Sequence, residues 1–188
     1  MRLQYNSPVV LTYTFLCCII LFLSPFTGGL LMNLFTVRNT MSLTNPVDYF
    51  RLFSHALGHG DWSHLLSNFT FILLLGPMLE EKYGSANVLT MMFLTALVTG
   101  IINVIFFSSG LLGASGIVFM MILLSSMTNL RQGTIPITFV LVVVLFLGKE
   151  VISMVGEKNN ISESAHIIGG ICGAVFGFMG GSVEGKKV

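Results

Sequence analysis

The sequence predicts an all-α membrane protein, a bundle of six transmembrane helices with a long membrane-associated first loop. Of the 188 residues, 54% are hydrophobic and only 9% are charged, whereas about 25% of the residues of a soluble domain are charged. The apolar residues gather in blocks of about 20, the length that a helix needs to cross a bilayer. Because only helices and closed barrels span membranes, blocks of this length indicate helices.

Six apolar blocks are separated by polar or glycine-rich turns, and residues 1–188 are expected to form a single membrane domain. The expected spans are 9–31, 63–83, 86–107, 115–130, 135–155 and 165–182, with residues 32–62 as the first loop. Pro25 and the pair Gly28-Gly29 are expected to loosen the end of the first span. A loop as long as 32–62 is uncommon in a compact domain, and its own apolar residues predict that it lies at the membrane interface.

Charge and cysteine usage exclude several classes of protein. A net charge of +1 supplies no clustered basic face, so nucleic acid is not an expected partner. The apolar blocks make the lipid bilayer an expected partner. The three cysteines, Cys17, Cys18 and Cys172, all lie in apolar blocks and are interpreted as small packing residues.

The expected topology places both termini on one side of the membrane, because the number of spans is even. On that side lie Arg2, Lys82, Arg131, Lys186 and Lys187, against Arg38, Arg51, Lys149 and Lys158 on the other side. This bias favours cytoplasmic termini. The first block has no cleavage site of the small-x-small type and is expected to remain as a helix. We expect no transit peptide, and the expected location is a prokaryotic inner membrane.

The fourth span is too short to cross, and it begins at a serine in the run GASGIVF (113–119). Its 16 residues extend about 24 Å, against a hydrocarbon core of about 30 Å. A helix of this length can begin inside the membrane if the preceding backbone is buried in protein or faces water. Ser115 would then lie below the surface at a helix amino terminus, where free N–H groups favour negative charge.

Polar residues inside apolar blocks are costly and therefore indicate function. His64 and Asn68 are four residues apart, on one face of the second span. His166 lies on the face of the last span that also carries Gly169 and Gly173, and small residues at this spacing let two membrane helices approach closely. If the neighbouring helix carries Ser115, a hydrogen-bonded Ser–His pair follows, in which the histidine takes the serine proton.

Each of these signals has a simpler interpretation when taken alone. A single buried histidine is commonly a satisfied polar residue, glycine faces commonly serve packing alone, and GxSG occurs in many unrelated chains. His55 and His59 in HALGH resemble half of a zinc site, but the run lacks the glutamate of HExxH. No metal and no cofactor is therefore expected.

Taken together, the motifs resemble the rhomboid family of intramembrane serine proteases. The matching pieces, in order and spacing, are Arg51, HALGH (55–59), His64-x-x-x-Asn68, Glu80 with Gly84, GASG (113–116) and AHIIGG (165–170). They cover nearly all of residues 50–177. The resemblance implies a six-helix bundle with a water-filled cavity that opens to the external face, opposite the termini.

The resemblance also implies the residue roles. Ser115 is the expected nucleophile and His166 the general base, in a dyad without a carboxylate. His64, Asn68 and the backbone N–H of Ser115 are the expected oxyanion hole, whose donors stabilise the tetrahedral intermediate. The expected supporting residues are Gly113, Gly116, Phe119, His59 and Gly169. Arg51 is expected to hold the first loop, and Glu80 to be a structural hydrogen-bonding residue.

Three positions depart from the family pattern. Phe119 stands where a tyrosine is common, so the ring under the histidine is kept and its hydroxyl is lost. Phe50 replaces a usual tryptophan, and Ser67 stands where a bulky aromatic residue commonly closes lateral substrate entry. None of these changes removes a catalytic group.

The predicted function is a serine endopeptidase that cuts transmembrane segments of other proteins. The alternative is a catalytically silent rhomboid-like protein that binds transmembrane helices without cutting them, and the retention of Ser115, His166, His64 and Asn68 together argues against it. A channel or transporter would need a polar path through the bundle, whereas here the polar residues gather at one depth.

Overall fold

The computed structural model describes residues 4–107, 110–128, 134–147 and 161–184. All the regular elements among these residues are helices. The only strand-like pairing among them is an isolated bridge between Val37 and Leu111. In chain order the elements are α1 (Pro8–Leu23), the 3₁₀ turn η1 (Ser24–Thr27), α2 (Leu30–Leu34), α3 (Pro46–Ser54), the 3₁₀ turn η2 (His55–Leu57), α4 (Trp62–Tyr83), α5 (Ser85–Phe106), α6 (Ser115–Ser126), α7 (Ile137–Val142), the π-helical turn η3 (Val143–Leu147) and α9 (Ile161–Glu184). The predicted all-α fold class is confirmed.

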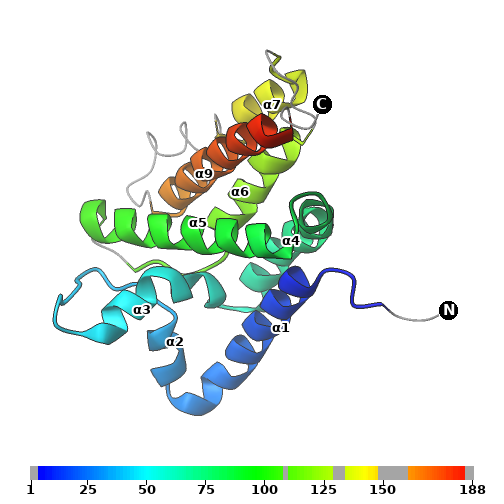
Figure 1. Cartoon of the computed structure of the whole chain (residues 1–188). Coiled ribbons are helices and arrows are strands. Elements are labelled where there is room, and N and C mark those ends of the chain that lie inside the picture. The colour runs from blue at the N-terminus through cyan, green and yellow to red at the C-terminus, as the bar shows by residue number, and fades with distance from the viewer. Residues whose placement is uncertain (1–3, 108–109, 129–133, 148–160, 185–188) are drawn as a thin grey trace.

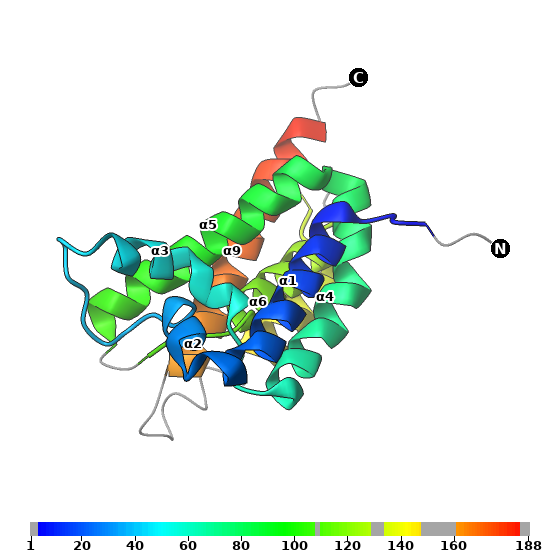
Figure 2. The ribbon, with the colours of Figure 1, turned by 90° about the horizontal axis from the view of Figure 1, so that it is seen from below.

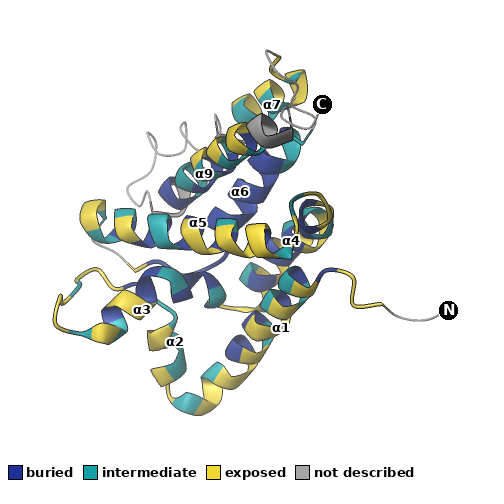
Figure 3. Ribbon diagram, viewed as in Figure 1, coloured by how far each residue is buried: buried dark blue, intermediate teal, exposed yellow. Residues whose placement is uncertain are grey.

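Helix α6 forms the centre of the bundle. Nine of its 12 residues are buried, and it contacts α4, α5, α7 and α9, which surround it in Figures 1 and 2. A helix that is apolar on all sides is expected to be enclosed by its neighbours. Figure 3 shows α6 as a buried element, while the outward faces of α1 and α5 are exposed.

Three helical segments among the described residues are long and apolar enough to cross a membrane: Pro8–Thr27, Trp62–Tyr83 and Ser85–Phe106. Large apolar side chains on them face outward, and Leu74, for example, is 70% exposed. Contiguous apolar surface of this extent is rare on a soluble monomer. The outer surface of the bundle therefore suits lipid contact.

The first segment is shorter than the predicted span 9–31. Its helical part ends at Thr27, and Gly28 and Gly29 follow with φ of 56° and 85°. This left-handed conformation is readily available to glycine. It turns the chain out of the helix, and the separate short helix α2 follows.

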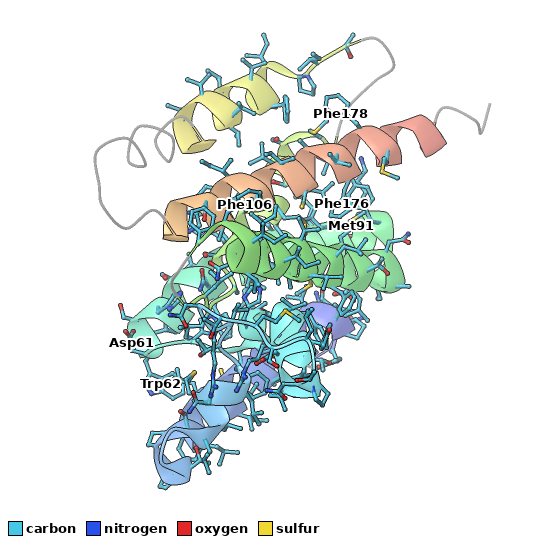
Figure 4. All side chains as sticks on the ribbon, turned by 90° about the vertical axis from the view of Figure 1, so that its left-hand side faces the viewer. Asp61, Trp62, Met91, Phe106, Phe176 and Phe178 are labelled. Carbon is cyan, nitrogen blue, oxygen red and sulfur yellow. The ribbon has the colours of Figure 1, made fainter. Side chains whose placement is uncertain are left out.

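The second and third spans agree with the prediction to within one residue at each end. Asp61 caps α4 by accepting the backbone N–H of His64 at 2.8 Å. Figure 4 labels Asp61 and Trp62 at this end of α4. Trp62 is 49% exposed, and tryptophan is enriched where membrane helices meet water. This end of α4 therefore suits a membrane–water interface.

The later helices differ more from their predicted bounds. Helix α6 is 12 residues long, about 18 Å, and the predicted end of that span at residue 130 lies outside the described residues. The predicted span 135–155 begins as α7 at Ile137 and turns π-helical at Val143, and its residues 148–155 also lie outside the described part. Helix α9 begins at Ile161 instead of 165.

Helix α9 packs against several elements at once. Figure 4 shows Phe176 and Met91 in the region between α9 and α5. Phe178 faces α7, where its ring centroid lies 6.1 Å from that of Phe139. These aromatic contacts help to position the helix that carries His166.

Two polar side chains hold distant segments together, as the sequence predicts. Arg51 is buried, donates from Nε to the carbonyl of Asn33 at 2.6 Å and pairs with Asp48. The Glu80 carboxylate accepts the backbone N–H groups of Val9 and Val10 at 3.0 and 3.1 Å. Arg51 thus ties the first loop down, and Glu80 supplies the amino-terminal cap of α1.

Candidate active site

The GASG motif forms the turn that leads into α6. Gly113 has φ of 117°, and a Cβ built on it would lie 2.7 Å from both Cε1 and Nε2 of the His64 ring. Only glycine meets both conditions, since other residues rarely adopt this φ and have no room here. The Gly113 N–H donates to the carbonyl of His55 at 3.0 Å. The backbone before the serine is therefore held between the first loop and α4.

Ser115 is the first residue of α6 and is half-buried. The first four N–H groups of a helix have no partner within that helix, and the positive end of the helix dipole lies beside them. Ala114, the preceding residue, is completely buried. The hydroxyl of Ser115 thus lies at a helix amino terminus inside the bundle, as the sequence predicts.

Helices α6 and α9 meet backbone to backbone next to this serine. A Cβ built on Gly169 would lie 2.0 Å from the carbonyl oxygen of Gly116, and one built on Gly173 would lie 2.2 Å from that of Met120. A Cβ on Gly116 would in turn approach the carbonyl oxygen of Ala165 to 3.3 Å. This line of contact, which we call the α6–α9 seam, therefore begins between Ser115 and His166.

The ring of His166 lies flat on that of Phe119. Their centroids are 4.3 Å apart and the rings are inclined by only 5°. Ser115 and Phe119 are four residues apart and share one face of α6. The imidazole is thus packed against the same helical face that carries the serine hydroxyl.

His64 and Asn68 approach the motif from α4. Besides its contact with His64, the Cβ position of Gly113 lies 3.9 Å from Nδ2 of Asn68. Asn68 is 5% exposed, and its Nδ2 has no hydrogen-bond partner among the described residues. A buried donor without a partner is costly. This amide is therefore free to donate to a bound group.

The site lies at a consistent depth along the two flanking helices. Asn68 is six residues after Trp62, about 9 Å along α4 at 1.5 Å per residue. Gly116 packs against Thr99, which is seven residues before Phe106, about 10 Å from the end of α5. The polar groups therefore gather about 10 Å below one end of the bundle.

His55 and His59 brace this region from the first loop. His55 Nε2 lies 3.0 Å from the carbonyl of Ala96, and the His59 ring contacts the rings of His64 and Phe69 with centroids 5.1 and 6.0 Å apart. Burial lowers the pKa of each, His55 and His59, to about 4. Both are therefore neutral at pH 7, and both act by packing and hydrogen bonding beside the site.

Thr99 is a supporting residue that lies in none of the sequence motifs. Its hydroxyl donates to Thr95 and Ala96 carbonyls at 2.9 Å and lies 3.4 Å from His55 Nε2, while its methyl group faces Gly116. A signal was present, because Thr95, Thr99 and Asn103 repeat at steps of four in an apolar block and so share one helix face.

Comparisons with known proteins identify the family of this chain. The family model described as Rhomboid domain matches residues 46–183, a range that contains every site residue named above. A curated relative, Rhomboid protease GlpG of Haemophilus influenzae, is 24% identical over 135 residues, which cover 70% of this chain and 70% of the relative. With its apolar, outward-facing helices, the chain is an integral membrane protein of the rhomboid family.

Proposed function

We propose that the chain is an intramembrane serine endopeptidase that hydrolyses peptide bonds in or near transmembrane segments of membrane proteins by a Ser115–His166 dyad. Its family and its curated relative, which is named a protease, support hydrolysis. The observation that carries the residue assignment is the flat stack of His166 on Phe119, one helical turn from Ser115 on the same face.

The proposed reaction follows from the chemistry of the two side chains. Nε2 or Nδ1 of His166 accepts the Ser115 proton as Oγ attacks the scissile carbonyl, and the same proton passes to the leaving amine as the C–N bond breaks. Water then attacks the acyl-serine, with His166 again as base, and releases the second product. No metal or cofactor takes part in this scheme.

The oxyanion of each tetrahedral intermediate needs donors that point to it. We assign the Ser115 backbone N–H, His64 and Asn68 to this role. The partnerless Nδ2 of Asn68 and the contact of His64 with Gly113 support the assignment. In a site shielded from bulk water each such donor is worth about 2.7–4 kcal/mol of the barrier.

The proposed substrate is a transmembrane helix that unwinds readily, because attack on a peptide bond requires an extended backbone. The depth of the site, about 10 Å below the end of α4, suits cleavage near the end of such a helix. We further propose that this end faces the outside of a prokaryotic inner membrane, with cytoplasmic termini.

The decisive experiment is cleavage of a labelled membrane-helix substrate by the reconstituted protein. Ser115→Ala and His166→Ala are each expected to lower the rate by about 10³-fold or more. Ser125→Ala is the matched control, because Ser125 lies on the same helix and only caps the carbonyl of Ile122. Cleavage that survives either dyad substitution contradicts the assignment, and loss of cleavage with retained helix binding distinguishes catalysis from the binding-only alternative.

Two further measurements test Ser115 as the nucleophile and Asn68 as a donor to the oxyanion. A fluorophosphonate probe is expected to label the wild type and Ser125→Ala but not Ser115→Ala. Asn68→Ala is expected to lower kcat by about 10²–10³-fold with little change in KM. An effect on KM alone would show that Asn68 binds substrate instead of stabilising the oxyanion.

A further inference from the structure

An apolar groove of about 500 Å³ runs between α1 and α5, away from the candidate active site. It is also lined by Ile117 of α6, Ala56 and Leu57 of η2 and Phe53 of α3. Ile117 and Phe119 are two residues apart, about 200° around the helix. The groove therefore lies behind the face of α6 that carries Ser115 and Phe119.

The groove presents a hydrocarbon surface. Its polar side chains are already hydrogen-bonded within the protein: the Tyr13 hydroxyl donates to the carbonyl of Ala56, Thr12 bonds to Tyr5, and Ser85 donates to Glu80. All the other lining residues are apolar. Water in such a space would find few partners. The occupant that suits this lining is therefore apolar.

The length of the groove matches one leaflet of a bilayer. Along α1 it reaches from Pro8 to Leu16, and along α5 from Ser85 to Ala96, about 12 and 16 Å at 1.5 Å per residue. One leaflet contributes about half of a 30 Å hydrocarbon core. Both helices begin at the same end, since Glu80 bonds to the first turn of α1 and to Ser85. The groove thus runs from one membrane surface to about the midplane.

The rims of the groove are open to the side. Leu89 is 56% exposed, and Leu16 and Phe93 are each 44% exposed. A hydrocarbon chain can therefore enter from the surrounding lipid. A second transmembrane helix is too large, because 20 residues at a diameter of 10–12 Å occupy on the order of 2,500 Å³. The volume suits a single flexible hydrocarbon chain.

We propose that this groove binds one acyl chain of a phospholipid from the leaflet at the Pro8 and Ser85 end. The acyl chain fills the space behind α6 and packs on Ile117, two residues after Ser115. It also packs on Ala96, whose carbonyl is bonded to His55. The bound lipid is thus a structural ligand of the first turn of α6. This proposal does not depend on the catalytic assignment.

The test uses the full chain in phosphatidylcholine vesicles that contain a small fraction of lipid with a photoactivatable diazirine in the middle of one acyl chain. Adducts are mapped by peptide mass spectrometry. We expect labelling at Thr12, Leu89 and Phe93 to exceed labelling at Leu74 of α4 by about fivefold. Leu74 is 70% exposed but lies outside the groove, so labelling in proportion to exposure would overturn the proposal.

Substitutions that fill the groove with a larger side chain provide a second test. Leu89→Trp, and independently Thr12→Phe, are expected to reduce the adducts on Phe93 about fivefold, whereas the control Leu74→Trp leaves them unchanged. Thermal unfolding verifies that each variant is folded. Undiminished labelling of Phe93 in both folded groove variants would overturn the proposal. Displacement of the label by an unlabelled transmembrane peptide would also overturn it, because the occupant would then be a helix.

Discussion

The α6–α9 seam and the first loop hold the site from two sides by different means. At the seam, glycines bring two backbones into direct contact at Gly116 and Gly169. In the loop, buried polar side chains bond to backbone carbonyls, as Arg51 does to Asn33 and Ser54 does to Leu34 at 2.9 Å. Both regions thus position the GASG motif. The seam does so by direct backbone packing, and the loop does so by hydrogen bonds from polar side chains.

The difference follows from the state of the backbone. Helices satisfy their own N–H and C=O groups, so two helices in a membrane associate by close packing. An irregular loop leaves carbonyls without backbone partners, and buried polar side chains must supply the donors. The seam should therefore be sensitive to added volume, and the loop to a lost donor.

Among the tests of this comparison between seam and loop, Gly169→Ala has the largest expected effect. The new Cβ would lie 2.0 Å from the Gly116 carbonyl oxygen, so α9 must move away and carry His166 with it. A displacement of about 1 Å in a catalytic group costs about 10²-fold in rate, and overpacking destabilises by about 1–3 kcal/mol. Cleavage rate and thermal unfolding measure the two effects. Gly60→Ala is the control, because its Cβ meets nothing within 4 Å; equal behaviour of the two variants would refute the seam.

The next effect, on stability and not directly on the cleavage rate, is expected for Arg51→Ala. It removes the bond to Asn33 and leaves Asp48 without its buried cation, at a cost of about 3 kcal/mol. Arg51→Lys should recover only part of this, because an ammonium group lacks the planar fork of arginine. Chemical unfolding in detergent gives the free energy. Arg38→Ala, in the same loop but exposed, should stay within about 0.5 kcal/mol.

The stability that the first loop provides should also depend on pH. Folding lowers the pKa of His55 from 6.5 to about 4, so the unfolded chain binds more protons between these values and stability falls as pH falls through this window. The loss that His55 alone contributes is about 2 kcal/mol between pH 7 and pH 5. Asp48 does not obscure it, because the Ser42 N–H holds the pKa of Asp48 below 3.8.

The measurement is thermal unfolding of the wild type and His55→Gln from pH 7 to pH 5. His55→Gln is expected to be less stable at pH 7 but to depend less on pH. An equal slope for the two proteins would exclude His55 as the titrating group. His59, whose pKa burial also lowers to about 4, is expected to contribute to the slope that remains.

The smallest effect concerns Phe119. Phe119→Leu removes the aromatic stack on His166, worth about 0.5–1.5 kcal/mol, and should lower kcat about two- to tenfold. Phe119→Tyr keeps the ring and is expected to change kcat less than about twofold. A large gain from the added hydroxyl would show that packing alone does not hold the imidazole.

The local features of the fold were predictable from sequence. The ends of α4 and α5 follow from capping and turn residues near 61 and 84, and the break after Thr27 follows from Gly28-Gly29. Gly113 and His166 were identifiable by their motifs. Residues 129–133 and 148–160 lie outside the described part of the chain, so the count of six spans remains a prediction.

The contacts between distant segments were not predictable in the same way. The bridge from Val37 to Leu111 and the bond from Tyr13 to Ala56 join residues far apart in the chain. No local periodicity encodes such pairings, because they depend on how complete helices pack. The early start of α9 at Ile161 has a local cause, since the polar residues 162–164 follow it and hydropathy alone does not reveal this first turn.

The contact of Glu80 with α1 also bears on the order of biosynthesis. A ribosome releases Val9 and Val10 about 70 residues before the carboxylate that caps them at 3.0 and 3.1 Å. Until the end of α4 has emerged, the first turn of α1 must borrow its partners from water or from the insertion machinery. The first turn of α1 therefore gains its cap within the protein only after α4 has been synthesised and has packed beside it.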